Sequence, residues 1–235
     1  MNLDSFRAQL EEEQAWRIEE ILFFQNHCAS IHDEMARKKF RRALILLLYS
    51  NFEGFCQFAL SLYLSCINLA QVKCSEANWA IAASSLSDVF EALRNPEKKA
   101  PEFKSILPDD SKLHRFSRDR EFVEKAIEIM QRTVVLPDSI VDTESNLKPA
   151  ILRKNLFRLG LPFEQFESLE GDIRKLLGFR NRIAHGATRL GIGEKIYVEM
   201  RDAAFRIMSD TAVTITRAYH EKWYLKHDGK KIDCV

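Results

Sequence analysis

Hydrophobic residues recur at spacings of three and four through most of the chain, which places them on one face of an α-helix. In the first segment this face predicts a helix that reaches about residue 30, with Asp4 or Ser5 as its N-cap. Further helices are predicted over about 33–71, 75–95, 117–130, 146–159, 166–186 and 197–224. Ser75, Ser117 and Asn146 are the expected N-caps of three of them.

The segment 33–71 is the most hydrophobic part of the chain. Its basic flank and apolar run raise the question of a membrane span, but Asn51, Glu53 and Gln57 interrupt the run. A carboxylate at bilayer depth is costly, and neither side of the interruption is long enough to cross alone. We therefore expect no membrane insertion but a buried central helix, covered in part by a second subunit.

Residues 95–117 are the least regular part of the chain, because three prolines fall among several charges. We expect a long loop there. A basic cluster lies at the end of this segment and just after it, formed by Lys112, His114, Arg115, Arg118 and Arg120. Two interpretations of this cluster stay open: a solvated surface, which is the commoner outcome for charged runs, and a patch that contacts RNA.

No repeat and no shift of composition marks a domain boundary. Residues 134–137 suggest a brief extended piece, but the sequence shows no strand that would pair with it. The sequence therefore predicts one all-α domain over residues 1–235, a helical bundle with long central helices and an irregular insert at about 95–117.

The composition restricts the function further. Lys and Arg number 35 against 34 Asp and Glu, so affinity for nucleic acid would have to come from a local patch. The five cysteines contain no CxxC pair, and four of them fall in apolar helical segments, which is typical of a reducing compartment. Because the N-terminus also has no basic-then-apolar signal sequence, we expect a cytoplasmic protein.

One short stretch, residues 180–186 with the sequence Arg-Asn-Arg-Ile-Ala-His-Gly, departs from this regular pattern. Arg180 stands where the apolar face of the preceding helix would take another Leu, and Gly186 stands where the helix is expected to stop. A purely structural interpretation is that Arg180 extends from the edge of the apolar face while His185 favours the negative helix end.

Other chemistry finds little support in the sequence. There is no HxxxH or HExxH, no acidic EF-hand loop, no glycine-rich phosphate loop and no GxSxG. His27 and His32 lie five positions apart, which does not place two imidazoles together on a helix. We therefore expect no metal site and no cofactor.

The pattern Arg180-Asn181-x-x-x-His185 resembles the Arg-polar-x-x-x-His signature of the HEPN superfamily. The apolar stretch 46–55 and the residues before the motif helix, Asn146-Leu147 and Leu159-Gly160-Leu161, are similar to its RiboL-PSP-HEPN branch. The resemblance implies an all-α, usually dimeric protein. Many such proteins are metal-independent endoribonucleases that act as toxins or phage-defence effectors.

The activity implied by this resemblance makes physical sense, because RNA carries its own nucleophile, the 2′-OH. His185 would accept or deliver a proton near neutral pH, and Arg180 would hold a phosphate oxygen and stabilise the developing charge. Asn181 would orient the histidine or the phosphate. The expected products are a 2′,3′-cyclic phosphate and a free 5′-OH.

Residues five apart on a helix point about 140° apart, which makes a site within one chain awkward. As in the family, a homodimer would bring two motif helices together in a composite active site. Glu53 is expected to pair with Arg180 or Arg182 in a supporting role, because a buried carboxylate needs a partner. Arg182 would face solvent or, less expectedly, the RNA backbone.

In the branch controlled by nucleotidyltransferase-mediated AMPylation, a Tyr follows two residues after the motif His. Ala187 occupies that place here, which argues against this control. An antitoxin or partner protein of the Toprim or nucleotidyltransferase type is implied only by the resemblance to this family. The alternative functions are a non-catalytic HEPN module that binds RNA or a partner protein, and a structural role for the Arg–His pair at a dimer interface.

Overall fold

The structure is a computed structural model that describes residues 1–100, 110–144, 146–187 and 189–226. Over these residues it is all-α, as predicted, with isolated β-bridges in place of strands. The α-helices are α1 (Leu3–Ala29), α2 (Glu34–Leu69), α3 (Trp79–Ser85), α4 (Ser87–Arg94), α5 (Ser111–Gln131), α6 (Pro149–Arg158), α7 (Glu170–Ala184) and α8 (Glu194–His220). Short 3₁₀ turns lie at Asp138–Ile140 and Glu167–Leu169.

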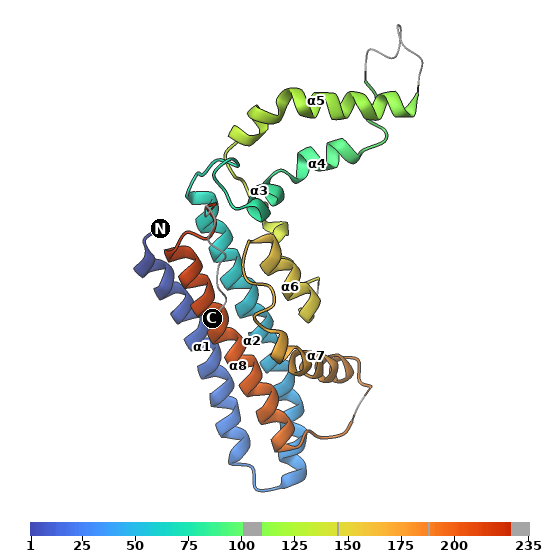
Figure 1. Ribbon diagram of the computed structural model, residues 1–235. Coiled ribbons are helices and arrows are strands. Elements are labelled where there is room, and N and C mark those ends of the chain that lie inside the picture. The colour runs from blue at the N-terminus through green and yellow to red at the C-terminus, as the bar shows by residue number, and fades with distance from the viewer. Residues whose placement is uncertain (101–109, 145, 188, 227–235) are drawn as a thin grey trace.

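The long helices α1, α2 and α8 form the body of the molecule, with α6 and α7 at its side (Figure 1). α2 is the central helix, because α1, α7 and α8 all pack against it. Its largest side chains with no exposed surface include Tyr63, Phe52 and Phe55. At the other end of the chain, the ring of Tyr219 on α8 stacks on Phe6 of α1 with centroids 4.5 Å apart. The two termini of the bundle are thereby joined.

Among the described residues, α2 alone has the length and composition of a membrane span. However, 56% of its most apolar window is buried inside the protein, as in the core helix of a bundle. Asn51, one of the polar residues that interrupt the run, donates to Glu20 at 2.8 Å and to the backbone oxygen of Leu47 at 3.1 Å. The side-chain amide of Asn51 is therefore hydrogen-bonded to other groups of the protein.

The N-caps predicted for α1 and α3 are wrong, because neighbouring residues supply the caps. The side chain of Asn2 accepts a hydrogen bond from the backbone N–H of Ser5 at 2.7 Å, so Asn2 caps α1 in place of Asp4 or Ser5. Likewise, Ser75 does not cap α3, because the side chain of Asn78 caps this helix by accepting a hydrogen bond from the N–H of Ala80. Asn, Asp and Ser are all good N-caps, so the sequence alone does not decide which of several neighbouring candidates caps the helix.

The single helix predicted over 75–95 is two helices. The chain turns at Leu86, which is the C-cap of α3 and the N-cap of α4. Leu86 is buried, with 4% of its surface exposed. The break between α3 and α4 thus falls at a buried side chain, and the spacing of hydrophobic residues did not predict it.

The loop predicted over 95–117 is helical in its last part. Asp110 accepts hydrogen bonds from the N–H groups of Lys112 at 2.6 Å and Leu113 at 3.4 Å, so α5 begins at Ser111 and not at Ser117. Residues 101–109 of this predicted loop lie outside the described residues. α5 and α4 pair with one another and extend away from the bundle as an arm (Figure 1). The predicted basic cluster therefore lies on a projecting helix, where His114 is buried.

The extended piece near Val134 has a partner that the sequence did not reveal. The N–H of Val134 donates to the backbone oxygen of Val72 at 2.8 Å, and Lys73 and Thr133 form an isolated antiparallel bridge. This short pairing connects the end of α5 with the turn that follows α2.

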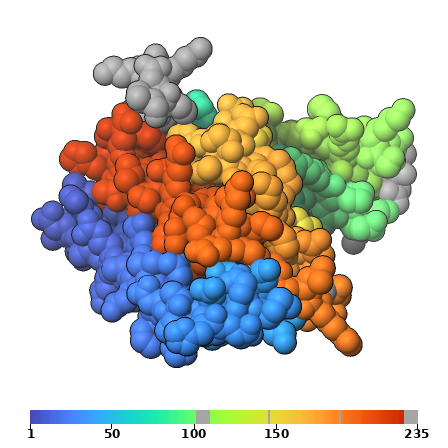
Figure 2. Space-filling model, turned by 90° about the horizontal axis from the view of Figure 1, so that it is seen from below, coloured from blue at the N-terminus to red at the C-terminus, as the bar shows by residue number. Residues whose placement is uncertain are grey.

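The connection from α7 to α8 is fixed on the N-terminal end of α2. Gly186 has a φ of +67°, a conformation that favours glycine, and it ends α7 where the sequence predicted. A Cβ on Gly191 would lie 2.4 Å from the Cβ of Lys38, and the N–H of Ile192 donates to the Lys38 oxygen at 3.0 Å. In Figure 2 the light-blue start of α2 lies beside the orange segments of the α7–α8 region. The segment that follows the motif helix is therefore anchored on α2.

Candidate active site

The motif stretch occupies the last turns of α7. The apolar face of this helix buries Ile173, Leu176, Leu177 and Ile183. Phe166 and Leu169, which the sequence placed on the same helix, instead belong to the preceding turn, since α7 begins at Glu170. The same face carries the half-buried Arg180, because its register continues that of Leu176. The predicted placement of a guanidinium on the inner face is confirmed.

The described partners of the Arg180 side chain are neutral groups. Its Nη1 donates to Oδ1 of Asn146 at 2.9 Å and to Oδ1 of Asn181 at 2.8 Å. The guanidinium carbon lies 5.1 Å from the centroid of the Tyr49 ring on α2, within the range of a cation–π contact. Among the described residues, no carboxylate forms an ion pair with Arg180. Within the described residues its positive charge is therefore held in position without an ion pair.

Asn146 reaches Arg180 from the segment before α6, and it does not act as the predicted cap of that helix. Lys148 occupies the N-cap position of α6 and makes no side-chain capping bond there. The neighbouring Leu147 is buried, and its N–H donates to the hydroxyl of Tyr49 at 2.7 Å and to Oε1 of Glu53 at 3.1 Å. Two side chains of α2 therefore fix the segment that presents Asn146.

Tyr49 links the parts of this site. Its pKa is raised to about 12, chiefly by burial and also by the adjacent Glu53 carboxylate, which acts through its charge and through hydrogen bonding to the protonated hydroxyl. The N–H of Leu147 and the positive charge of Arg180 act in the opposite direction. The hydroxyl is therefore protonated at neutral pH. Sequence reasoning missed Tyr49 as a site residue, although its position one helical turn before Glu53 was a usable signal.

Glu53 does not make the ion pair expected for it. No salt bridge within the described residues joins it to Arg180 or Arg182; it accepts instead from the Leu147 N–H. The physical reason is that Tyr49, and not a carboxylate, lies under the Arg180 guanidinium. Glu53 thus reaches Arg180 through Tyr49 and the segment of Asn146.

His185 and Arg182 are exposed and form no hydrogen bond to the side chains of this cluster among the described residues. His185 is the exposed C-cap of α7, and its backbone N–H donates to the backbone oxygen of Asn181 at 3.0 Å. No hydrogen bond joins the imidazole to Arg180 in the described part of the chain. Arg182 is exposed and lies 4.6 Å from the ring centroid of Phe179. One chain therefore brings Arg180 and Asn181 together but leaves His185 apart.

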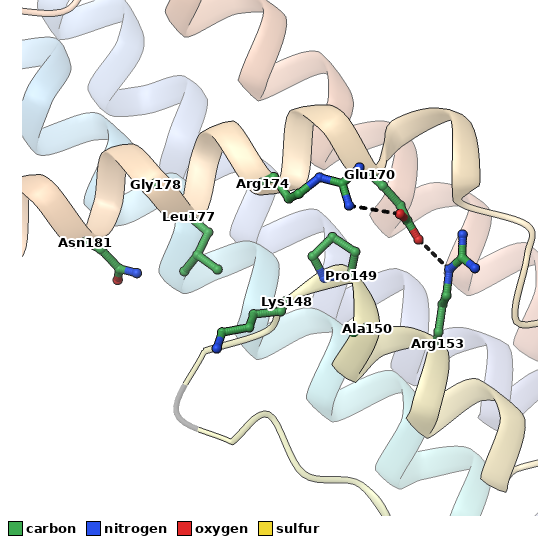
Figure 3. Close-up of a pocket in the computed structure, with 9 residues that line it drawn as sticks. All are labelled: Lys148, Pro149, Ala150, Arg153, Glu170, Arg174, Leu177, Gly178 and Asn181. Atoms are coloured by element: carbon green, nitrogen blue, oxygen red, sulfur yellow. Dashed lines mark hydrogen bonds and ion pairs between the residues drawn. The ribbon is translucent and has the colours of Figure 1, made fainter.

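A cleft of about 570 Å³ opens beside the motif, between the start of α6 and one face of α7 (Figure 3). Asn181 and Lys148 lie at one end of it, while Glu170, Arg174 and Arg153 form an ion-paired group at the other. Asn181 belongs to both the Arg180 cluster and the cleft. Periodicity could not reveal the cleft, because its walls come from separate segments of the chain.

In the described residues no group of three or more His, Cys, Asp or Glu side chains is arranged to hold a metal ion. The motif and its neighbours supply guanidinium, amide, imidazole and hydroxyl groups, and the Glu53 carboxylate lies beside the Tyr49 hydroxyl. This set can bind and orient an anion and can transfer a proton.

The family model of RiboL-PSP-HEPN matches residues 12–217, which include every residue of this cluster. Comparisons with curated proteins and with solved structures return no match. The match extends over most of the chain and includes α2, the segment of Asn146 and the whole of α7. The chain belongs to the RiboL-PSP-HEPN family, which suggests an RNA-related function.

Proposed function

We propose that this protein is a metal-independent endoribonuclease, a toxin or defence effector of the HEPN type. The 2′-OH of the RNA attacks the adjacent phosphorus, and the bond to the 5′-oxygen of the next nucleotide breaks. The products are a 2′,3′-cyclic phosphate and a 5′-OH. The proton lost by the 2′-OH and the proton gained by the leaving oxygen are transferred at His185. Arg180 binds the non-bridging oxygens, and Asn181 orients the phosphate beside it.

The observation that carries this proposal is the state of Arg180. A half-buried guanidinium is usually paired with a carboxylate, because an unpaired charge is costly away from water. Here its described partners are two amide oxygens and an aromatic ring, which orient it but leave the charge uncompensated. A phosphodiester supplies the missing negative charge.

The separation of Arg180 and His185 supports a composite site. The imidazole is exposed at the end of α7 and makes no hydrogen bond to Arg180 within the described residues, so one chain does not bring the required pair together. A two-fold dimer that apposes two α7 ends supplies each Arg180 with the His185 of its partner. Arg182, exposed on the same turn, then contacts the RNA backbone next to the cleaved bond.

The test is incubation of purified protein with single-stranded RNA in excess EDTA, with end analysis of the products. We expect cleavage that leaves 2′,3′-cyclic phosphate ends, and loss of about a hundredfold or more in His185→Ala and Arg180→Ala. Lys222→Ala, on the turn after α8, is a matched control that should cleave like wild type. Absence of cleavage by wild type, together with retained RNA binding, would select the non-catalytic module instead.

A further inference from the structure

The cleft beside the motif contains a glycine that the fold does not require. Gly178 lies in the interior of α7, where glycine is a poor helix former. Its φ is not in the left-handed region, and a Cβ built on it would have no atom within 4 Å. Neither backbone conformation nor close packing within this chain explains a glycine at this position. It leaves open space on the wall of the cleft.

The cleft face of α7 is regular. Glu170, Arg174, Leu177, Gly178 and Asn181 follow one another at helical spacing and all line the cleft. In Figure 3 the apolar part of the lining, formed by Leu177, Gly178 and Pro149, lies between the two polar ends. A volume of about 570 Å³ lies within the range of about 300–1,000 Å³ found for small-molecule sites.

The polar groups of the cleft favour a negatively charged ligand. Its lining contains three cationic side chains, Lys148, Arg153 and Arg174, against one carboxylate, that of Glu170. Arg153 and Arg174 are both paired with Glu170. The ammonium of Lys148 has no hydrogen bond or ion pair within the described part of the chain, and it lies at the same end of the cleft as Asn181 (Figure 3). The uncompensated charge is thus next to the motif.

We propose that this cleft is a subsite for one nucleotide of the RNA strand, adjacent to the cleaved bond. The proposal rests on the proposed function, because Asn181 is shared between the motif and the cleft. The phosphate of the nucleotide lies at Lys148, and its base packs on the apolar wall where Gly178 leaves room. The edge of the base faces Glu170 and Arg174, which offer an acceptor and donors for hydrogen bonds.

The experiment fills the cleft without disturbing the fold. Gly178→Leu places a side chain in the open space, while Gly171→Leu is the matched control: Gly171 is also in α7 and also has no atom within 4 Å of its Cβ position, but it does not line the cleft. Binding is measured with a fluorescent 2′-O-methyl RNA oligonucleotide, which lacks the attacking hydroxyl and so reports binding without cleavage. Cleavage of the unmodified RNA is measured in parallel.

We expect Gly178→Leu to weaken binding of the oligonucleotide about tenfold or more, the loss of one base contact, while Gly171→Leu binds like wild type. The melting temperature of Gly178→Leu should not fall, since a better helix former replaces glycine. Lys148→Ala should lower the slope of log Kd against log salt by about 0.7, the value for one phosphate contact on a single strand.

Unchanged binding by a folded Gly178→Leu protein would overturn the subsite, even if wild type cleaves RNA. Loss of binding together with loss of the dimer, measured by light scattering, would overturn it too, because a second copy would then fill the cleft. If Gly178→Leu weakens binding but wild type cleaves no RNA, the subsite stands and the nuclease proposal fails.

Discussion

Arg180 on α7 donates a hydrogen bond of 2.9 Å to Asn146, a residue 34 positions earlier in the segment before α6. The acceptor is a neutral amide, so the bond aligns the guanidinium while its full positive charge is retained. A carboxylate of the same size would align it equally well and neutralise it. This difference between alignment and neutralisation is the basis of the first prediction.

Asn146→Asp should separate stability from activity. The new carboxylate replaces the amide oxygen beside Arg180, so the free energy of unfolding should stay equal or rise by about 1 kcal/mol. RNA cleavage should fall about tenfold or more, because the phosphate then competes with an internal anion. Urea unfolding and single-turnover cleavage measure the two quantities. Cleavage at the wild-type rate would show that the charge of Arg180 is not used.

The Tyr49 hydroxyl should make stability depend on alkaline pH. Its pKa is raised, chiefly by burial, to about 12, above the ordinary value of about 10, so the folded state favours the protonated form. The stabilisation is fully present below pH 10 and is lost as pH rises through about 12. The difference in unfolding free energy between wild type and Tyr49→Phe should therefore be constant up to about pH 10 and narrow above it. Urea titrations at several pH values test this, and a constant difference would contradict it.

Glu53 should act as a supporting residue and not in proton transfer. Glu53→Gln keeps an oxygen that accepts from the Leu147 N–H, so cleavage should remain within about fivefold of wild type. Glu53→Ala removes the acceptor and should destabilise the protein by about 1–3 kcal/mol, with a larger loss of cleavage. If Glu53→Gln were as inactive as Glu53→Ala yet fully folded, the carboxylate would have to take part in the chemistry.

A composite site predicts complementation between two inactive proteins. Arg180→Ala and His185→Ala chains, mixed under conditions that allow subunit exchange, should form heterodimers in which one intact Arg180 meets one intact His185. Cleavage should then recover to a measurable fraction of wild type, while neither variant alone is active. A mixture as inactive as its components, with exchange confirmed by mass spectrometry, would place the pair within one chain.

The spacing of hydrophobic residues along the chain was sufficient to predict many of the helices of this fold. The long helices α1, α2 and α7 lie close to their predicted ranges, because their apolar faces are long enough to define the period. Prediction failed where a single side chain decides a boundary. Asp110 caps α5, which therefore begins within the expected loop, and the turn at Leu86 divides a predicted helix into two. Such decisions depend on competing caps and on packing, to which periodicity is insensitive.

By itself, the sequence determined the helical class, the motif and the position of Arg180 on the inner face of its helix, since these follow from the spacing of residues along one element. Only the tertiary structure decided what Arg180 meets there. It assigned Tyr49 and Asn146 as partners, removed Glu53 from direct contact and placed an open cleft at Asn181. The physical reason is that contacts between distant segments depend on how the helices pack, and the chemistry of a buried charge is set by those contacts.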